Sequence, residues 1–300
     1  MNATAPITPN PDECLLRPGN TNCGGCGMSI GLTMLGRALA EAGDTCTLVI
    51  PACCGIVTAG AFPTTSYGVP TIATTFASSP AVASGVASIR DLNNESGQVI
   101  CWAGDGGTYD IGLGTLSAAA ERNENIIYIC YDNEIYGNTG GQRSSATPVG
   151  ARTTTTPGGK IEGKKDIMSI MAAHRIPYAA TLSVAHPDDF ARKMSTALSI
   201  QGMRFLLMHS PCPTGWKSEP EDSIDLVRLA VESGLFPLYE VFDGLRYRIN
   251  IEPDGTDPAE YFRRQRRFKD DEIDLAVTRR ACSDFMQRLR SLAQQYPAEE

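Results

Sequence analysis

A glycine-rich turn carrying a single carboxylate follows an apolar segment near the middle of the chain. The segment Val99–Ala103 (VICWA) predicts a buried strand, and Gly104, Asp105, Gly106 and Gly107 come directly after it. Glycines in such a place let backbone N–H groups approach a diphosphate closely. A carboxylate there can hold Mg²⁺ against phosphate oxygens. The same residues would also suit an ordinary turn in which the aspartate caps the next helix.

A second polar side chain stands at the corresponding place after the next predicted strand. Asn133 lies 28 residues after Asp105 and follows the apolar run Ile126–Tyr131 (IIYICY). The carboxyl ends of neighbouring parallel strands meet at one edge of a sheet, where ligands bind. A GDG turn followed by an asparagine in this way resembles the signature of thiamine diphosphate enzymes. That resemblance implies that Asp105, Asn133 and the backbone carbonyl of Ile135 hold Mg²⁺.

Cysteine is the other residue type with chemistry to offer, with ten cysteines against three histidines. Cys23 and Cys26 form a C-x-x-C motif in a loop-like segment, while Cys53, Cys54 and Cys212 follow predicted strands. Such thiols could form a redox dithiol, part of a zinc site, or the ligands of an iron–sulfur cluster. The chain has no second C-x-x-C motif and no H-x-x-x-H motif. Spacing alone leaves these alternatives open.

The elements that would position these residues alternate between apolar strands and helical patterns. This alternation predicts a doubly wound α/β fold, a parallel sheet with helices on both faces. Cys101 and Cys130 lie inside two of the strands and are expected in the core. The predicted strands are Cys46–Ile50, Val99–Ala103, Ile126–Tyr131 and Arg204–His209, and the predicted helices are Ile30–Ala42, Ala81–Leu92, Ile111–Arg122, Ile167–Ala173 and Pro187–Ile200.

The charge balance excludes some classes of partner. The chain has 26 Lys and Arg against 34 Asp and Glu, a net charge of −8 at pH 7. Without a basic surplus, nucleic acid and a membrane surface are poor candidates. The N-terminal residues resemble no signal peptide, so we expect a reducing cytoplasm.

Charge is also distributed unevenly along the chain. Residues 45–89 contain no charged side chain, but prolines interrupt this run, so we expect it to form core and a subunit interface, not a membrane span. The segment 151–165 is expected to be a long functional loop. The charged run RRQRRFKDDEID (263–274) is expected to be a solvent-exposed helix or tail.

Five motifs occur together in a fixed order along the chain. The set closely resembles the β subunit of 2-oxoacid:ferredoxin oxidoreductases, most nearly the pyruvate type. The segments PLYE (237–240) and EYFRRQRRF (260–268) resemble that family's tail, so the resemblance covers nearly the whole chain. The five motifs are CGGCG (23–27), PACCG (51–55), GDGGTYDIG (104–112), YDNEIYGNTGGQRSSATPVGA (131–151) and PCPTGW (211–216).

The resemblance implies one [4Fe–4S] cluster bound by four of the cysteines. Cys23 and Cys26 match the family's C-x-x-C ligands, and Cys212 matches the late ligand before Pro and Thr. Family members have glycine and then cysteine where this chain has Cys53 and Cys54, which implies Cys54 as the remaining ligand.

The resemblance also implies the residues of a thiamine diphosphate and Mg²⁺ site. Asn138 matches an asparagine that lies near the reactive thiazolium and the substrate, and it is the expected catalytic residue. We expect residues 1–234 to form the α/β domain that carries these loops, and residues 235–300 an extension that packs on the core or on a partner subunit. The expected cofactor-binding residues are Cys54, Gly55, Gly104, Asp105, Gly106, Gly107, Asn133, Ile135, Asn138 and Thr139.

The implied activity is oxidative decarboxylation of a 2-oxo acid, with pyruvate favoured and electrons leaving singly through the cluster. The acceptor would be ferredoxin or γ/δ-type electron-transfer subunits, and coenzyme A would take the acyl group in a pyruvate-type enzyme. The glutamate that activates thiamine is expected on an α subunit, because residues 1–90 offer no suitable one. The chain should therefore be inactive alone.

Other interpretations of the motifs are open, and most of them account for fewer of the candidate residues. Members of the same superfamily that act on oxalate or an aryl glyoxylate could carry much the same subunit. A zinc-stabilised binding subunit would explain the cysteines but not Asp105 and Asn133. An acetolactate-synthase-like thiamine enzyme would not need the four cysteines, and a nicotinamide dehydrogenase would need a GxGxxG motif that GDGG does not supply.

Overall fold

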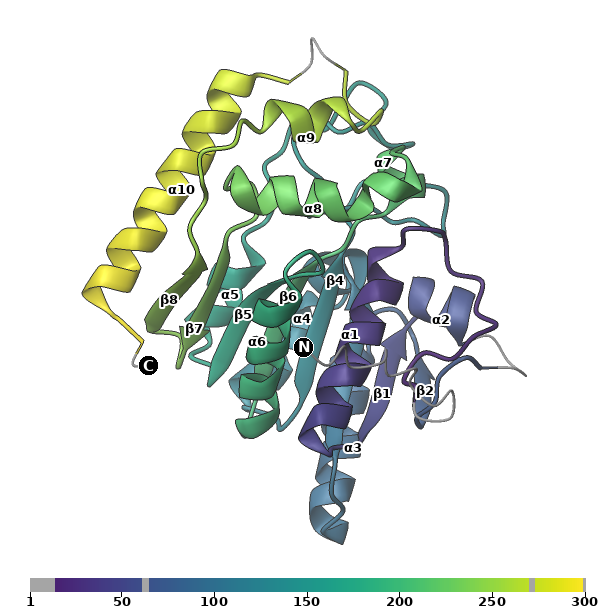
Figure 1. Cartoon of the computed structure of the whole chain (residues 1–300). Helices are drawn as coiled ribbons and strands as arrows, with labels where there is room; N and C mark the ends of the chain where they lie inside the picture. The colour runs from purple at the N-terminus through teal and green to yellow at the C-terminus, as the bar shows by residue number, and fades with distance from the viewer. Residues whose placement is uncertain (1–13, 61–64, 270–272, 299–300) are drawn as a thin grey trace, which may run out of the picture.

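The computed structural model describes residues 14–60, 65–269 and 273–298. Its centre is an eight-stranded sheet with the order β2-β1-β3-β4-β6-β5-β7-β8. Helices cover both faces of this sheet (Figure 1), which confirms the predicted α/β fold. The strands are β1 (Cys46–Pro51), β2 (Thr71–Thr74), β3 (Gln98–Gly104), β4 (Ile127–Asp132), β5 (Tyr178–Ser183), β6 (Arg204–His209), β7 (Leu238–Phe242) and β8 (Arg246–Ile251).

The inner strands are apolar along their whole length because helices bury them from both sides. Along β3, Ile100 and Trp102 point into one core cluster, whereas Cys101 and Ala103 point into the other. This is the alternation that the pleat of a strand imposes. Cys101 and Cys130 are fully buried, as predicted.

The helices divide between the two faces of the sheet. The predicted helices are confirmed to within a few residues, and a one-turn π-helix (Gly106–Asp110) precedes α4. One core cluster lies under α1 (Gly27–Ala42), α2 (Cys54–Ala59) and α6 (Pro187–Ser199). The other lies under α3 (Ser79–Asn93), α4 (Leu113–Glu121) and α5 (Ile167–Ala173).

Two strands of the parallel sheet were not predicted. β2 (TIAT) and β5 (YAATLS) are built largely from Thr, Ala and Ser, so neither presents a continuous apolar run. Both become strands because a neighbouring strand is already in place to pair with them: β2 pairs with β1, and β5 pairs with β6. Tertiary context decides strand formation in such segments.

The C-terminal residues extend the same sheet and do not form a separate layer. β7 pairs antiparallel with β5, and β8 pairs antiparallel with β7, so the residues expected to form an extension (235–300) add an antiparallel edge to the parallel sheet. Helix α10 (Leu275–Gln295) runs along the outside of β8, at the left of Figure 1. The remaining elements, α7 (Pro213–Trp216), α8 (Ser223–Glu232) and α9 (Ala259–Arg263), lie above the carboxyl ends of the strands.

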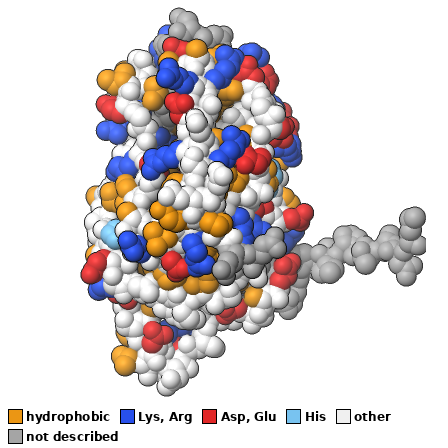
Figure 2. All heavy atoms as spheres, turned by 90° about the vertical axis from the view of Figure 1, so that its left-hand side faces the viewer, with side chains coloured by type: hydrophobic (Ala, Val, Ile, Leu, Met, Phe, Trp, Pro, Cys, Tyr) orange, Lys and Arg blue, Asp and Glu red, His pale blue; other side chains and the backbone are white. Residues whose placement is uncertain are grey.

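The outer face of the C-terminal extension carries charges of both signs between hydrophobic side chains (Figure 2). Arg279 pairs with Asp257 at 2.6 Å, and Arg290 pairs with Glu252 at 2.7 Å. Exposed pairs of this kind contribute little to stability. Within the described ranges, no helix is long and apolar enough to cross a membrane.

The charged run at 263–274 is not uniformly exposed. Helix α9 ends at Arg263, and the Arg267 side chain is only 1% exposed. The prediction of a solvated run is therefore wrong at Arg267, which is buried because it pairs with an internal glutamate. Residues 270–272 lie outside the described residues.

Candidate active site and cofactor loops

The residues predicted to bind cofactors follow the carboxyl ends of four neighbouring strands. Cys54 follows β1, Asp105 follows β3, Asn133 follows β4 and Cys212 follows β6. The sheet has a switch point between β1 and β3, because β2 lies on the outer side of β1 and β3 lies on its inner side. Open α/β sheets bind ligands in the crevice at such a point.

Three oxygen atoms converge beside the end of β3. The Asn133 side-chain oxygen lies 2.9 Å from Asp105 Oδ1 and 2.8 Å from the Ile135 carbonyl oxygen. The backbone N–H of Ile135 donates to the same Asn133 oxygen at 3.3 Å. Two arrangements relieve this crowding of oxygens: the amide turns over and donates to both neighbours, or a cation sits among the three.

With its oxygen turned toward Asp105 and Ile135, Asn133 stands at distances from both that fit neighbouring ligands of Mg²⁺. This ion takes octahedral oxygen ligands at 2.0–2.1 Å, so adjacent ligand atoms stand about 2.9 Å apart. Asp105 is 1% exposed, and it forms no ion pair with any other described residue. Burial and the nearby charge of Asp132 raise the pKa of Asp105 well above its usual range, while Ser144 Oγ donates to its Oδ2. A cation would supply the positive charge that this carboxylate lacks.

The turn that holds the Asn133 and Ile135 oxygens is strained. Glu134, between them, has a φ of 64°, in the left-handed region that costs a non-glycine residue about 1 kcal/mol. Thr147 Oγ1 donates to the Glu134 carbonyl at 2.6 Å. The turn is therefore kept by contacts from other parts of the chain.

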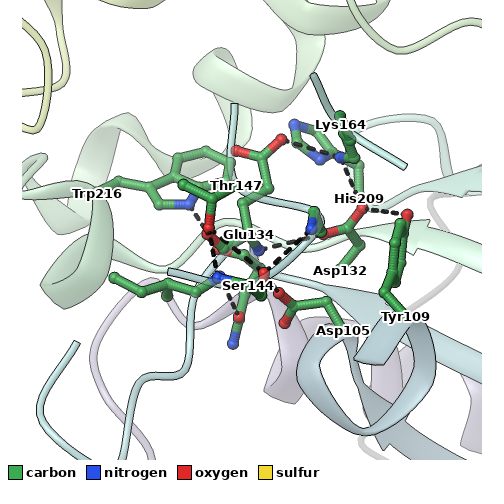
Figure 3. Close-up of polar contacts among 12 residues, drawn as sticks. Asp105, Tyr109, Asp132, Glu134, Ser144, Thr147, Lys164, His209 and Trp216 are labelled. Atoms are coloured by element: carbon green, nitrogen blue, oxygen red, sulfur yellow. Dashed lines mark hydrogen bonds and ion pairs between the residues drawn. The ribbon is translucent and has the colours of Figure 1, made fainter. Parts of the chain in front are cut away.

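A partly buried network of charges holds this turn in place (Figure 3). Lys164 Nζ lies 2.7 Å from Asp132 Oδ2 and 3.2 Å from Glu134 Oε1, and Tyr109 Oη donates to Asp132 Oδ2 at 2.9 Å. Burial alone would raise the pKa of Glu134, but Lys164 and Arg267 outweigh it and lower the pKa to about 2. Glu134 is thus a carboxylate held by two cations.

Sequence reasoning missed this network. Lys164 belongs to the segment 151–165, whose prediction as a long loop is confirmed, and Arg267 belongs to the run predicted to be solvated. Loop lysines and arginines are usually exposed, and nothing in RRQRR marks one arginine as internal.

A cavity of about 580 Å³ lies between the sheet and α10. Phe236, Tyr239 and Phe285 contribute to its apolar wall, while Glu134 and His209 lie at its polar end. It borders the back of the charge network, and neither Asp105 nor the four predicted cluster ligands line it.

We expect His209→Phe to make folding stability less sensitive to acid. Burial lowers the pKa of His209 to about 3, and its ring stacks on Phe236 with centroids 4.7 Å apart. Below pH 6.5 the unfolded chain takes up a proton on this imidazole that the folded chain does not, so stability falls as the pH falls. With a pKa of about 3 in the folded chain and 6.5 in the unfolded chain, His209 lowers the free energy of unfolding by about 2 kcal/mol between pH 7 and pH 5.

Urea unfolding of the wild type and the variant at pH 7 and pH 5 measures this difference. The matched control is His174→Phe, at a half-buried histidine that pairs with Ser117. Equal losses of stability in the wild type and in His209→Phe would contradict the prediction.

Close backbone contact brings two of the cysteine loops together. Gly27 N–H, directly after Cys26, donates to the Pro211 carbonyl at 2.9 Å. A Cβ on Gly27 would stand 2.2 Å from Pro211 Cδ, so only glycine fits there. Across the same contact, Thr214 Oγ1 lies 3.7 Å from Cys23 Sγ. The C-x-x-C loop and the Cys212 loop are therefore packed against each other.

The four predicted cluster ligands form one electrostatic group. Burial first, and then negative charge on Cys212, Cys53 and Cys26, raises the pKa of Cys54 to about 12. Burial, with Cys26 and Cys23 adding to it, raises the pKa of Cys212 to about 11. The free thiols of Cys54 and Cys212 are therefore neutral at pH 7, and bound iron would supply the charge that makes them thiolates.

The described cysteines form no site for a single metal ion. Among the described residues, no three His, Cys, Asp or Glu side chains stand close enough to hold one metal ion. The thiolates of a [4Fe–4S] cluster each bind a different iron atom, so they stand farther apart.

The paired cysteines after β1 face different surroundings. The thiol of Cys54 donates to Asn138 Oδ1 at 3.4 Å and lies in the group with Cys212 and Cys26. The Cys53 thiol instead lies against the Tyr131 hydroxyl and the backbone of Gly55. This geometry supports Cys54 as the ligand.

The remaining predicted residues lie in the turn after β3 and in the loop after β4. Gly104 to Gly107 are buried, and a Cβ on Gly106 would stand 2.3 Å from the Tyr136 ring. The π-helix that begins at Gly106 is of a kind often found at functional sites. Asn138 and Thr139 are exposed on the loop after β4, where Thr139 Oγ1 donates to Gln142 Oε1 at 2.5 Å.

Comparison with known proteins agrees with this arrangement. Residues 52–208 match the thiamine pyrophosphate enzyme, C-terminal TPP binding domain. The ketoisovalerate oxidoreductase subunit VorB of Pyrococcus horikoshii is 46% identical over 265 residues, 84% of either chain. The pyruvate synthase subunit PorB of Methanocaldococcus jannaschii is 45% identical over 273 residues, 86% of this chain and 90% of that one. The chain belongs to the β subunits of 2-oxoacid:ferredoxin oxidoreductases.

A solved structure of the same group shares the fold. The 2-oxoglutarate:ferredoxin oxidoreductase from Magnetococcus marinus, solved with 2-oxoglutarate, coenzyme A and succinyl-CoA bound, superposes with a TM-score of 0.61. It is 23% identical, and the match covers 74% of this chain and 82% of that one. As a β subunit of this family, the chain is part of a heteromeric oxidoreductase that uses thiamine diphosphate.

Proposed function

We propose that the chain is the β subunit of an enzyme that oxidatively decarboxylates pyruvate and passes single electrons through one [4Fe–4S] cluster. The acceptor would be ferredoxin or γ/δ-type electron-transfer subunits. The observation that carries the proposal is the meeting of Asp105 and Asn133 with a group of cysteines at the carboxyl ends of β1, β3, β4 and β6. Family membership supports the same conclusion.

The chain's own residues would hold the diphosphate end of the cofactor. Asp105, Asn133 and the Ile135 carbonyl would bind Mg²⁺, and the turn from Gly104 to Gly107, with Gly55 and Thr139, would line the cofactor. Thiamine diphosphate, when bound, supplies the carbanion that attacks the keto carbon and the ring that accepts electrons as CO₂ leaves. Exposed Asn138 would orient the substrate, which gains rate by proximity.

The cysteines would hold the electron acceptor next to this site. Cys23, Cys26, Cys54 and Cys212 would bind the cluster, which takes up one electron at a time. The hydrogen bond from Cys54 to Asn138 places the proposed catalytic residue directly beside a proposed cluster ligand. Electrons would therefore travel only a short way from the substrate to the cluster.

The glutamate that activates thiamine would come from an α subunit. In the described part of the chain, the buried glutamates are Glu134 and Glu240. Glu134 is held by Lys164 and Arg267, and Glu240 by Arg192 at 2.9 Å, so neither is available to a cofactor. The uncharged segment 45–89 would face that subunit, because it leaves Val57 and Ile89 57% and 61% exposed.

The relatives support a second candidate substrate. Pyruvate is named for some of them and ketoisovalerate for others at nearly the same identity, so a branched-chain 2-oxo acid is the alternative. Coenzyme A would take the acyl group in either case.

A reduction assay of the purified complex tests this function. Viologen or ferredoxin reduction would be followed with pyruvate, ketoisovalerate, 2-oxoglutarate, oxalate and an aryl glyoxylate, each with and without coenzyme A. We expect fastest reduction with pyruvate and a requirement for coenzyme A. Metal analysis accompanies the assay, and stoichiometric zinc without iron and acid-labile sulfide would refute the cluster.

A further inference from the structure

Arg267 is an internal arginine that the C-terminal extension places behind the cofactor loops. Its side chain is 1% exposed. Nη2 donates to Glu134 Oε2 at 2.5 Å, and Nε donates to Gln265 Oε1 at 2.8 Å. Its carbonyl accepts from the backbone N–H of Arg152 at 2.8 Å. Arg267 is thus deeply buried and bonded to three neighbours, while its buried Nη1 has no hydrogen-bond partner among the described residues.

One contact of Arg267 holds the proposed magnesium turn. Glu134 lies between the two residues whose oxygens face Asp105, and its backbone is left-handed. On the side of the C-terminal extension, Arg267 holds the Glu134 side chain through an ion pair. Lys164, from the loop 151–165, holds the same carboxylate through a second ion pair. Removing Arg267 would leave a strained turn with one anchor fewer.

A second contact of Arg267 reaches the loop of Cys212. Its guanidinium carbon lies 4.6 Å from the ring centre of Trp216, the last residue of α7. The Trp216 backbone N–H donates to the Cys212 carbonyl at 2.7 Å, and its Nε1 donates to the Asn133 carbonyl at 2.8 Å. Trp216 is therefore bonded to both loops, and Arg267 covers its ring.

We propose that Arg267 is a positioning residue: it holds the proposed magnesium turn (133–135) and the loop of Cys212 in a fixed position relative to each other. The inference rests on the proposed function, because it assigns Arg267 a role toward the Mg²⁺ and cluster ligands named there. The C-terminal extension thereby supports the site through Arg267, beside Tyr261, whose ring also packs on Trp216. Arginine suits this place because its planar group can pair with Glu134 at the edge while it stacks on Trp216 with its face.

The test compares variants of Arg267 within the assembled complex. Arg267→Met removes both contacts, and Arg267→Lys keeps a charge for Glu134 but loses the planar stacking. Arg266→Met is the matched control, since the Arg266 side chain is 70% exposed and, among the described residues, pairs only with surface Glu219 at 2.9 Å. The readouts are the Mg²⁺ concentration that half-saturates thiamine diphosphate binding, the EPR spectrum of the reduced cluster, and the thermal unfolding midpoint.

We expect Arg267→Met to require about 10- to 100-fold more Mg²⁺, the usual effect of losing a residue that supports metal ligands. The EPR spectrum of its reduced cluster should shift as well. Arg267→Lys should have a Mg²⁺ requirement and a spectrum between those of Arg267→Met and the wild type. Arg266→Met should match the wild type in both. A folded Arg267→Met with unchanged Mg²⁺ requirement and unchanged spectrum would overturn the inference. So would a failure of both Arg267 variants to assemble, which would show a role in folding alone. A wild-type complex without thiamine diphosphate or iron would instead overturn the proposed function.

Discussion

Asp105→Asn should abolish Mg²⁺-dependent binding of thiamine diphosphate by the assembled complex. The substitution keeps the shape of the side chain but removes the one carboxylate among the three converging oxygens. The protein would then offer the cation only neutral oxygens, and the diphosphate alone would balance its charge in a buried site. Losing a residue that merely supports metal ligands typically costs 10- to 100-fold in affinity, so losing the charged ligand itself should cost more than about 100-fold. Calorimetric titration of the cofactor-stripped complex across a range of Mg²⁺ concentrations measures this loss.

The same substitution should leave the cofactor-free protein at least as stable as the wild type. Burial and Asp132 raise the pKa of Asp105, so its ionisation at pH 7 costs folding free energy that asparagine avoids. Asp91→Asn, at an exposed position of α3, is the control for charge removal in general. Cofactor affinity that survives Asp105→Asn would refute the assignment, and a large drop in the thermal midpoint would show that the carboxylate is structural.

The fold could be predicted wherever the hydrophobic pattern alone decides it. β6 was predicted with its bounds, and β1, β3 and β4 to within two residues, because strands covered on both faces must be apolar throughout. β2 and β5 could not be predicted, because their Thr, Ala and Ser residues become strands only when a neighbour pairs with them. The antiparallel β7 and β8 lie beyond the region where strand and helix alternate, so that rule did not apply to them.

The site shows the same division between local and tertiary information. Asp105, Asn133, Cys54 and Cys212 could be proposed from the sequence because they belong to short motifs at strand ends. Glu134, Lys164 and Arg267 could not, because each is a charged loop residue and no local pattern shows that Glu134 pairs with the other two. Charged loop residues are exposed in most proteins, and only the tertiary structure shows that these three neutralise one another.

Cys212→Ser and Cys54→Ser should each remove or markedly alter the iron–sulfur cluster, whereas Cys53→Ser should leave it intact. Cys54 and Cys212 lie in one electrostatic group with the C-x-x-C motif, so each would bind its own iron atom. Serine oxygen is a poorer ligand than thiolate for the soft iron–sulfur core. Either variant should therefore lose up to four iron atoms per β subunit, or change the EPR spectrum of the reduced cluster.

Cys53→Ser is the matched control because it makes the same atomic change one residue away. The Cys53 thiol lies against Tyr131 and the backbone of Gly55, so its replacement should alter core packing without removing a ligand. We expect normal iron content and a wild-type EPR spectrum from it, with at most a small fall in the thermal midpoint. Loss of iron in Cys53→Ser, with retention in Cys54→Ser, would reverse the choice between the two.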